Sequence, residues 1–132
     1  MCARHFDVAV TAFRVALGDR LAPDIRDFVD LFTDDAVIEA PFDGDGTMPP
    51  VVGIDAIRRM TVGLEHVLRF DEVDFREVRE TKEQGVLVCE YDALLARADL
   101  KSRFRRRYIA VIGLRDGRIA HHREYGGPFL PV

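Results

Sequence analysis

The hydrophobic pattern of this chain changes its period near residue 70, and that change limits the folds open to it. Before residue 70 apolar side chains recur every three or four positions, whereas after it they alternate with polar ones, as in Val73, Phe75 and Val78. A period near 3.6 indicates helices with one apolar face, and a period of two indicates half-buried strands. Helices followed by a run of strands predict an α+β fold, in which helices cover one face of a curved mixed or antiparallel sheet.

Three helices and one short strand are expected in the first half of the chain. The first helix covers about residues 5–17, the second about residues 24–32, and the third residues 53–68. A short strand is expected at residues 36–40, between the second and third helices. The glycine-rich, acidic segment 42–50 predicts a loop.

Four longer strands are expected in the second half, at about residues 70–78, 86–95, 104–114 and 118–125. The dipeptide Asp116-Gly117 predicts a tight hairpin turn between the last two strands. A sheet of this length must curl to bury its apolar face. If the helices do not fill the curl, a cone-shaped pocket remains at its open end.

Length and composition favour a single domain over residues 1–132 and a small-molecule partner. With 132 residues and 48% hydrophobic residues the chain can bury one core, but it is too short for two ordinary domains. The net charge of -4 comes from intermixed acidic and basic residues, which argues against a nucleic-acid partner. No leader and no apolar run of about 20 residues is recognisable, so we expect no membrane association. Cys2 and Cys89 form no paired motif, which fits reduced thiols in a cytoplasmic protein.

Four segments carry a resemblance to a known family: DLFTDDAVIEAPF at 30–42, GIDAIRR at 53–59, FRRRYIAVIGLRDGRI at 104–119 and HHREYGGPF at 121–129. Together they resemble the SnoaL-like members of the nuclear transport factor 2-like superfamily, which also contains ketosteroid isomerases, limonene-epoxide hydrolases and phenazine-biosynthesis A/B-type proteins. The resemblance implies a sheet wrapped around helices to form one blind pocket. It specifies the fold better than the chemistry, because this superfamily hosts unrelated reactions and plain binding modules.

The last predicted strand offers the best candidates for catalysis. Strand alternation places Ala120, His122 and Glu124 on the pocket side, and a shift of one residue would exchange His122 for His121. The segment REYGGP is similar to the endings of phenazine A/B-type proteins and epoxide hydrolases, which carry a catalytic carboxylate there. The resemblance thus implies that Glu124 is an acid/base, and His122 could exchange protons with it near neutral pH. The alternative is a solvated carboxylate or an ion-pair partner of an arginine.

Departures from the family narrow the chemistry. The resemblance implies which positions correspond to the catalytic residues of the ketosteroid isomerases. Their general-base aspartate corresponds to Ala40, their oxyanion-hole aspartate to Ala110, and the tyrosine of their first helix to Phe13. Steroid isomerisation by that mechanism is therefore not expected. The arginine and aspartate of epoxide hydrolases fall on Tyr91 and Ala93, so epoxide opening is only a remote alternative.

The remaining pocket residues are predicted from strand parity and helix faces. Arg106 and Tyr108 share the parity of Ala110 and could hold a carbonyl, phenolate or carboxylate, although a solvated edge is the simpler interpretation of the run 105–107. Tyr91 could donate a hydrogen bond or merely pack. The expected substrate-binding residues are Phe13, Ala40, Met60, Leu87, Cys89, Tyr91, Arg106, Tyr108 and Ala110.

Two functional hypotheses follow. The first is a cofactor-independent enzyme of the isomerase, cyclase or dehydratase type, acting on a hydrophobic carbonyl-containing metabolite. The second is a non-catalytic ligand-binding or dimerisation module. No cofactor or metal is expected, because the sequence has no Cys/His cluster, phosphate loop or nucleotide fingerprint. The outward face of the sheet is apolar enough to predict a homodimer through Ile109, Val111, Ile119, His121, Arg123 and Tyr125.

Overall fold

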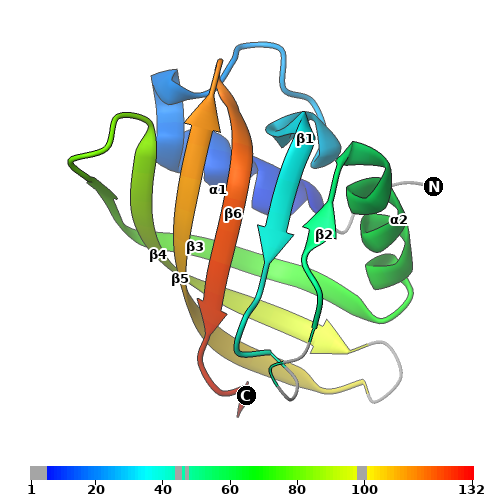
Figure 1. Ribbon diagram of the computed structural model, residues 1–132. Coiled ribbons are helices and arrows are strands. Elements are labelled where there is room, and N and C mark those ends of the chain that lie inside the picture. The colour runs from blue at the N-terminus through cyan, green and yellow to red at the C-terminus, as the bar shows by residue number, and fades with distance from the viewer. Residues whose placement is uncertain (1–5, 44–45, 47, 98–100) are drawn as a thin grey trace.

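A computed structural model describes residues 6–43, 46, 48–97 and 101–132 (Figure 1). Cys2, His5 and part of the loop 42–50 lie outside these ranges. The elements in chain order are α1 (Asp7–Leu17), η2 (Gly18–Arg20), η3 (Val29–Leu31), β1 (Phe32–Glu39), β2 (Val51–Val52), α2 (Ile54–Glu65), β3 (Leu68–Glu80), β4 (Val86–Arg97), β5 (Arg103–Arg115), β6 (Arg118–Gly126) and β7 (Leu130–Pro131). Within the described ranges no helix is long and apolar enough to cross a membrane.

The strands form a curved mixed sheet in the order β2-β1-β6-β5-β4-β3, and β7 pairs with β5. All strand pairs are antiparallel except β1 with β6, which run parallel. In Figure 1 the sheet bends strongly, α1 lies behind it, and α2 stands beside β2. The predicted α+β architecture is therefore confirmed, with two α-helices instead of about three.

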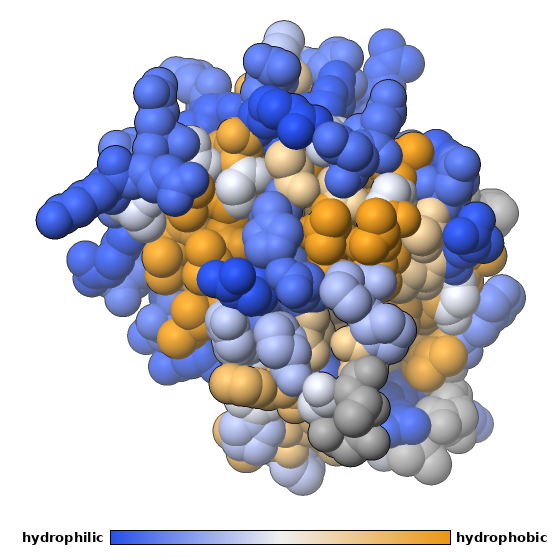
Figure 2. Space-filling view, viewed as in Figure 1, coloured by the Kyte–Doolittle hydropathy of each residue, from blue (hydrophilic) through white to orange (hydrophobic). Residues whose placement is uncertain are grey.

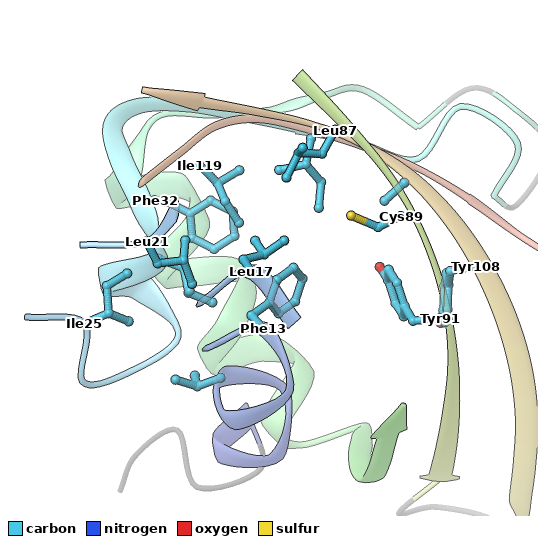
Figure 3. Close-up of a cluster of buried hydrophobic side chains, with 14 of the residues drawn as sticks. Phe13, Leu17, Leu21, Ile25, Phe32, Leu87, Cys89, Tyr91, Tyr108 and Ile119 are labelled. Atoms are coloured by element: carbon cyan, nitrogen blue, oxygen red, sulfur yellow. The ribbon is translucent and has the colours of Figure 1, made fainter. Parts of the chain in front are cut away.

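The core lies between the concave side of the sheet and the helices. On β4 the alternate residues Leu87, Cys89, Tyr91, Ala93 and Leu95 are all buried, as a period of two requires of a strand with one buried face. Helical and loop residues pack against them, and Figure 3 shows several of these side chains converging on the concave side. Burial of this apolar surface is the main stabilising contribution to the fold.

The predicted second helix is wrong, because the segment forms only the single 3-10 turn η3 before β1 begins at Phe32. Asp30 Oδ2 accepts hydrogen bonds from the backbone N–H groups of Arg26 and Asp27, and Asp27 Oδ1 accepts one from the Asp30 N–H. Such side-chain bonds to the backbone compete with helical ones. Ile25 is nevertheless buried in the core. The apolar residues of this segment therefore correctly predicted burial, but their spacing was wrongly interpreted as helical.

An irregularity in β6 corrects the predicted orientation of one residue. Gly113 pairs with His121 and Leu114 pairs with Ile119, so Ala120 is an extra residue opposite β5. A bulge of this kind changes which side chains face inward. Ile119, predicted to face outward, is therefore fully buried, while His122 keeps its inward orientation.

Candidate functional site

Glu124, His122 and Tyr91 meet on the concave side of the sheet. Tyr91 on β4 donates a hydrogen bond to Glu124 Oε1 at 3.2 Å, and His122 Nε2 lies 3.0 Å from the same oxygen. Ala110 on β5 is the register partner of both Cys89 and Glu124. Its side chain is only a methyl group, which leaves room above β5 for Tyr91 and Glu124 to touch.

The carboxylate of Glu124 is shielded but still reachable from solvent. Its side chain is 25% exposed, whereas that of His122 is only 8% exposed. The Phe13 ring of α1 lies 6.2 Å from the rings of both Tyr91 and His122, measured between centroids. Figure 3 shows Phe13 on the helix facing Tyr91 on the strand. One carboxylate oxygen is thus held in a largely apolar setting, the kind of environment in which acid/base groups are found.

Two stacked tyrosines extend the site along the sheet. The Tyr91 ring packs between Phe75, at 5.0 Å, and Tyr108, at 5.2 Å. Burial raises the pKa of Tyr91 well above its usual value, and the neighbouring Glu124 charge raises it further. Burial likewise raises the pKa of Tyr108 to about 12, with Glu124 as the second cause. Both hydroxyl groups therefore stay protonated and can serve as hydrogen-bond donors.

The raised tyrosine pKa predicts alkaline instability. An unfolded tyrosine ionises near pH 10, whereas Tyr108 keeps its proton until about pH 12. The stability that this group contributes is complete below pH 10 and is lost as the pH rises towards 12, at about 1.4 kcal/mol per pH unit. Urea denaturation at pH 9 and pH 11 measures this loss. The Tyr108→Phe variant, which has no proton to lose, should show a smaller loss; an equal loss would contradict the assignment.

Arg106 is held by protein groups at the end of the site. Its Nε donates to the Gly127 carbonyl at 2.8 Å and its Nη2 to Asp43 Oδ1 at 2.8 Å, while Nη1 lies 3.5 Å from the Tyr108 hydroxyl. The guanidinium carbon also lies 4.3 Å from the centre of the Phe129 ring. Burial by itself lowers the pKa of Arg106, but its hydrogen bond to Asp43 and the adjacent Tyr108 outweigh this effect, so the net shift is upward.

Gly126, two residues after Glu124, makes this packing possible. A Cβ atom on Gly126 would lie 2.3 Å from the guanidinium carbon of Arg106. Through these contacts Arg106 links both the loop after β1 and the segment after β6 to the sheet. Arg105 is exposed and Arg107 pairs with Asp92 at 2.7 Å, so Arg106 is the member of the run 105–107 that faces inward.

The other predicted pocket residues are divided between the core and the periphery. Leu87, Cys89 and Ala110 are buried in the core. Burial raises the pKa of the Cys89 thiol to about 11, so it remains protonated and is no nucleophile at neutral pH. Ala40 follows β1 and is half-buried. Met60 is half-buried on α2, which packs mainly on β1, β2 and β3, whereas Tyr91 lies on β4.

Sequence reasoning missed the roles of Asp43 and Phe75. Asp43 is 63 residues from Arg106 in the chain, and no local pattern links a loop carboxylate to a strand arginine. Phe75 shares the parity of Val73 on β3, and that alternation could have identified it as a wall residue.

The described residues line two open surface hollows. One, of about 730 Å³, lies between α1 and β3, and the other, of about 720 Å³, lies beside the hairpin turn between β5 and β6. Neither is lined by Glu124 or His122. The blind pocket around Glu124 therefore stays a prediction. Among the described residues no group of three or more His, Cys, Asp or Glu side chains could hold a metal ion.

Comparison with known proteins identifies the family. The chain is 23% identical over 130 residues to the uncharacterized protein YesE of Bacillus subtilis, covering 98% of this chain and 88% of that one. A Bacillus subtilis crystal structure provisionally named an isomerase superposes with a TM-score of 0.73, at 23% identity and 95% and 90% coverage. A phenazine biosynthesis-related protein of Pseudomonas aeruginosa gives 0.64, at 19% identity and 95% and 80% coverage. The family model for the SnoaL-like domain matches residues 9–122 of this chain, and the match ends two residues before Glu124. This chain belongs to the family of SnoaL-like domains.

Proposed function

We propose that this protein is a cofactor-independent acid/base enzyme of the isomerase, cyclase or dehydratase type. The observation that supports this proposal is the carboxylate of Glu124, which has one oxygen held by Tyr91 and near His122. In the described part of the chain no hydrogen bond engages its second oxygen, Oε2, and the side chain is partly open to solvent. A carboxylate in this position can exchange a proton with a bound substrate.

The chemistry suits a hydrophobic metabolite that contains a carbonyl group. Glu124 Oε2 takes a proton from the carbon next to the carbonyl, and the C–H electron pair forms an enolate. The neutral carboxyl then returns the proton to another carbon. In a cyclisation the enolate carbon instead attacks a second carbonyl, whose π bond breaks, and the resulting alkoxide oxygen takes the proton back from the carboxyl. Tyr108, a protonated hydroxyl beside Arg106, is the candidate donor to the carbonyl oxygen.

Solvent isotope exchange tests this proposal before the natural substrate is known. The protein is incubated in D₂O with a panel of hydrophobic ketones and 1,3-dicarbonyl compounds, and deuterium at the carbon next to the carbonyl is followed by NMR. Exchange above the buffer rate that is lost in the Glu124→Gln variant supports the proposal. If compounds bind but none exchanges faster than in buffer, the non-catalytic ligand-binding module is the better hypothesis.

The free, buried Cys89 thiol fits our proposal that the protein acts in the reducing cytoplasm.

A homodimer through the convex face of the sheet remains part of the proposal, with a corrected set of residues. Figure 2 shows apolar side chains on the face turned to the viewer, divided by a band of hydrophilic ones. Ile109 is 46% exposed and is the register partner of Tyr125, whose ring lies 5.1 Å from the exposed Phe42 ring. Ile119 no longer belongs to this face because it is buried.

Sedimentation at micromolar concentration should give the mass of two chains. Because Ile109 would lie inside such an interface, Ile109→Asp should shift the protein to a monomer, since it buries an unpaired charge. A matched charge on the exposed Val15 of α1, in Val15→Asp, should leave the dimer intact. A wild-type monomer, or a dimer unaffected by Ile109→Asp, would contradict the proposed interface.

A further inference from the structure

The imidazole ring of His122 has two nitrogens in very different surroundings. Nε2 lies 3.0 Å from Glu124 Oε1, as described above. Nδ1 is fully enclosed and has no hydrogen-bond partner among the described residues. The strand neighbours of His122 are Ile112 on β5 and Ile38 on β1, and the Phe13 ring lies 6.2 Å from it. The side of the ring that carries Nδ1 is therefore sealed by packing, and a proton there would have no acceptor.

These surroundings favour one of the three forms of the ring. A proton on Nδ1 would be a buried donor without an acceptor, and it would also leave Nε2 as a lone pair facing the Glu124 carboxylate. The doubly protonated ring would bury the same unpaired donor and a charge as well. With its single proton on Nε2, the ring donates a charge-assisted hydrogen bond to the carboxylate, and only the lone pair of Nδ1 lacks a partner.

We infer that His122 is a positioning residue, with a neutral ring whose proton stays on Nε2, and that it is not a proton relay. His122 and Tyr91 both donate to Glu124 Oε1 and fix the orientation of the carboxylate. Oε2 is then the oxygen that exchanges the proton with substrate, a step that rests on the proposed function. The proton can enter and leave through Oε2 while the ring keeps the same form. This replaces the sequence-based hypothesis that the His122 and Glu124 pair shares the proton.

The form of the ring can be measured without a substrate. Long-range ¹H–¹⁵N correlation spectra of the ¹⁵N-labelled protein at pH 7 distinguish a protonated ring nitrogen from an unprotonated one. The chain has four histidines, and the signals lost in His122→Gln identify those of His122. We expect a protonated Nε2 and an unprotonated Nδ1, in the wild type and in Glu124→Gln alike. A proton on Nδ1, or on both nitrogens, would overturn the inference.

A pair of variants tests the role once an exchanging compound has been found. In His122→Gln the amide nitrogen of the new side chain can take the place of Nε2 as a donor, whereas His122→Leu fills similar space with no donor. Loss of a charge-assisted hydrogen bond predicts a decrease in kcat of about 10- to 100-fold for His122→Leu. His122→Gln should restore most of that loss, because a donor suffices.

If His122 relayed protons, both variants should show the same decrease in kcat, since a glutamine side chain cannot relay a proton. Circular dichroism and urea denaturation show whether each variant keeps its fold. The two proposals can fail separately. Absence of exchange by any compound counts against the proposed function and leaves the nitrogen spectra unaffected, whereas equal impairment of both His122 variants counts against the positioning role alone.

Discussion

Replacing Glu124 with glutamine is expected to lower the rate of proton exchange by about 10²- to 10⁴-fold while the fold is retained. Glutamine has nearly the same shape, and its carbonyl oxygen can still accept the hydrogen bond from Tyr91 and one from His122. The amide in place of Oε2 cannot accept a proton at neutral pH. The loss should therefore appear in kcat, with little change in substrate affinity or in the free energy of unfolding.

The chain contains a matched control for this variant. Glu39 on β1 also contacts a histidine, since its Oε1 lies 2.6 Å from His121 Nε2. Its side chain is 29% exposed, close to the 25% of Glu124. Glu39→Gln removes a carboxylate from a similar pair outside the proposed site, so its exchange rate should stay near that of the wild type. If Glu39→Gln abolished exchange and Glu124→Gln did not, the reactive carboxylate would be the one paired with His121.

The long elements could be predicted because their signals are local. The helices α1 and α2 and the strands β3 to β6 lie where the period of the apolar residues placed them. The Asp116-Gly117 turn also formed as expected, with positive φ angles of 55° and 79°. In each case the residues that carry the signal are neighbours in the chain, so that no tertiary contact has to be known.

The errors arose where side chains or pairing overrode a local pattern. Asp27 and Asp30 bond to backbone N–H groups and replace the expected second helix with a single turn. The extra residue Ala120 is visible only in the pairing of β6 with β5, so strand parity alone predicted the wrong side for Ile119. His122 and Glu124 lie beyond this irregularity, and their inward orientation was therefore predicted correctly.

The candidate site itself depends on contacts between distant parts of the chain. Tyr91 and Glu124 are 33 residues apart, and Asp43 and Arg106 are 63 residues apart. The family resemblance pointed to Glu124, and parity pointed to Tyr91, Arg106 and His122 as inward residues. Two features of the site could be identified only from the folded structure. Arg106 is hydrogen-bonded to Asp43 and Gly127, and one oxygen of Glu124 is contacted by both Tyr91 and His122.

Replacing Gly117 with alanine should destabilise the fold by about 2 to 5 kcal/mol, combining a backbone strain of about 1–2 kcal/mol with the cost of overpacking. Gly117 has a φ of 79°, and a Cβ there would lie 2.6 Å from the backbone nitrogen of Ala22. That nitrogen donates a 2.9 Å hydrogen bond to the Gly117 carbonyl, so the loop after η2 cannot retreat without breaking it. Neither cost can be relieved by the rotation of a flexible side chain.

Urea denaturation of Gly117→Ala beside Gly63→Ala measures this effect against a matched change. Gly63 lies on the exposed side of α2, and a Cβ there would meet no atom within 4 Å. Alanine is the better helix former by about 0.5–1 kcal/mol, so Gly63→Ala should raise the midpoint of unfolding while Gly117→Ala lowers it. Both variants add the same methyl group. Shifts of opposite sign in the two unfolding midpoints would therefore be due to the backbone conformation of Gly117 and its contact with Ala22. Equal shifts in the two midpoints would show that the turn between β5 and β6 is not held against the loop after η2.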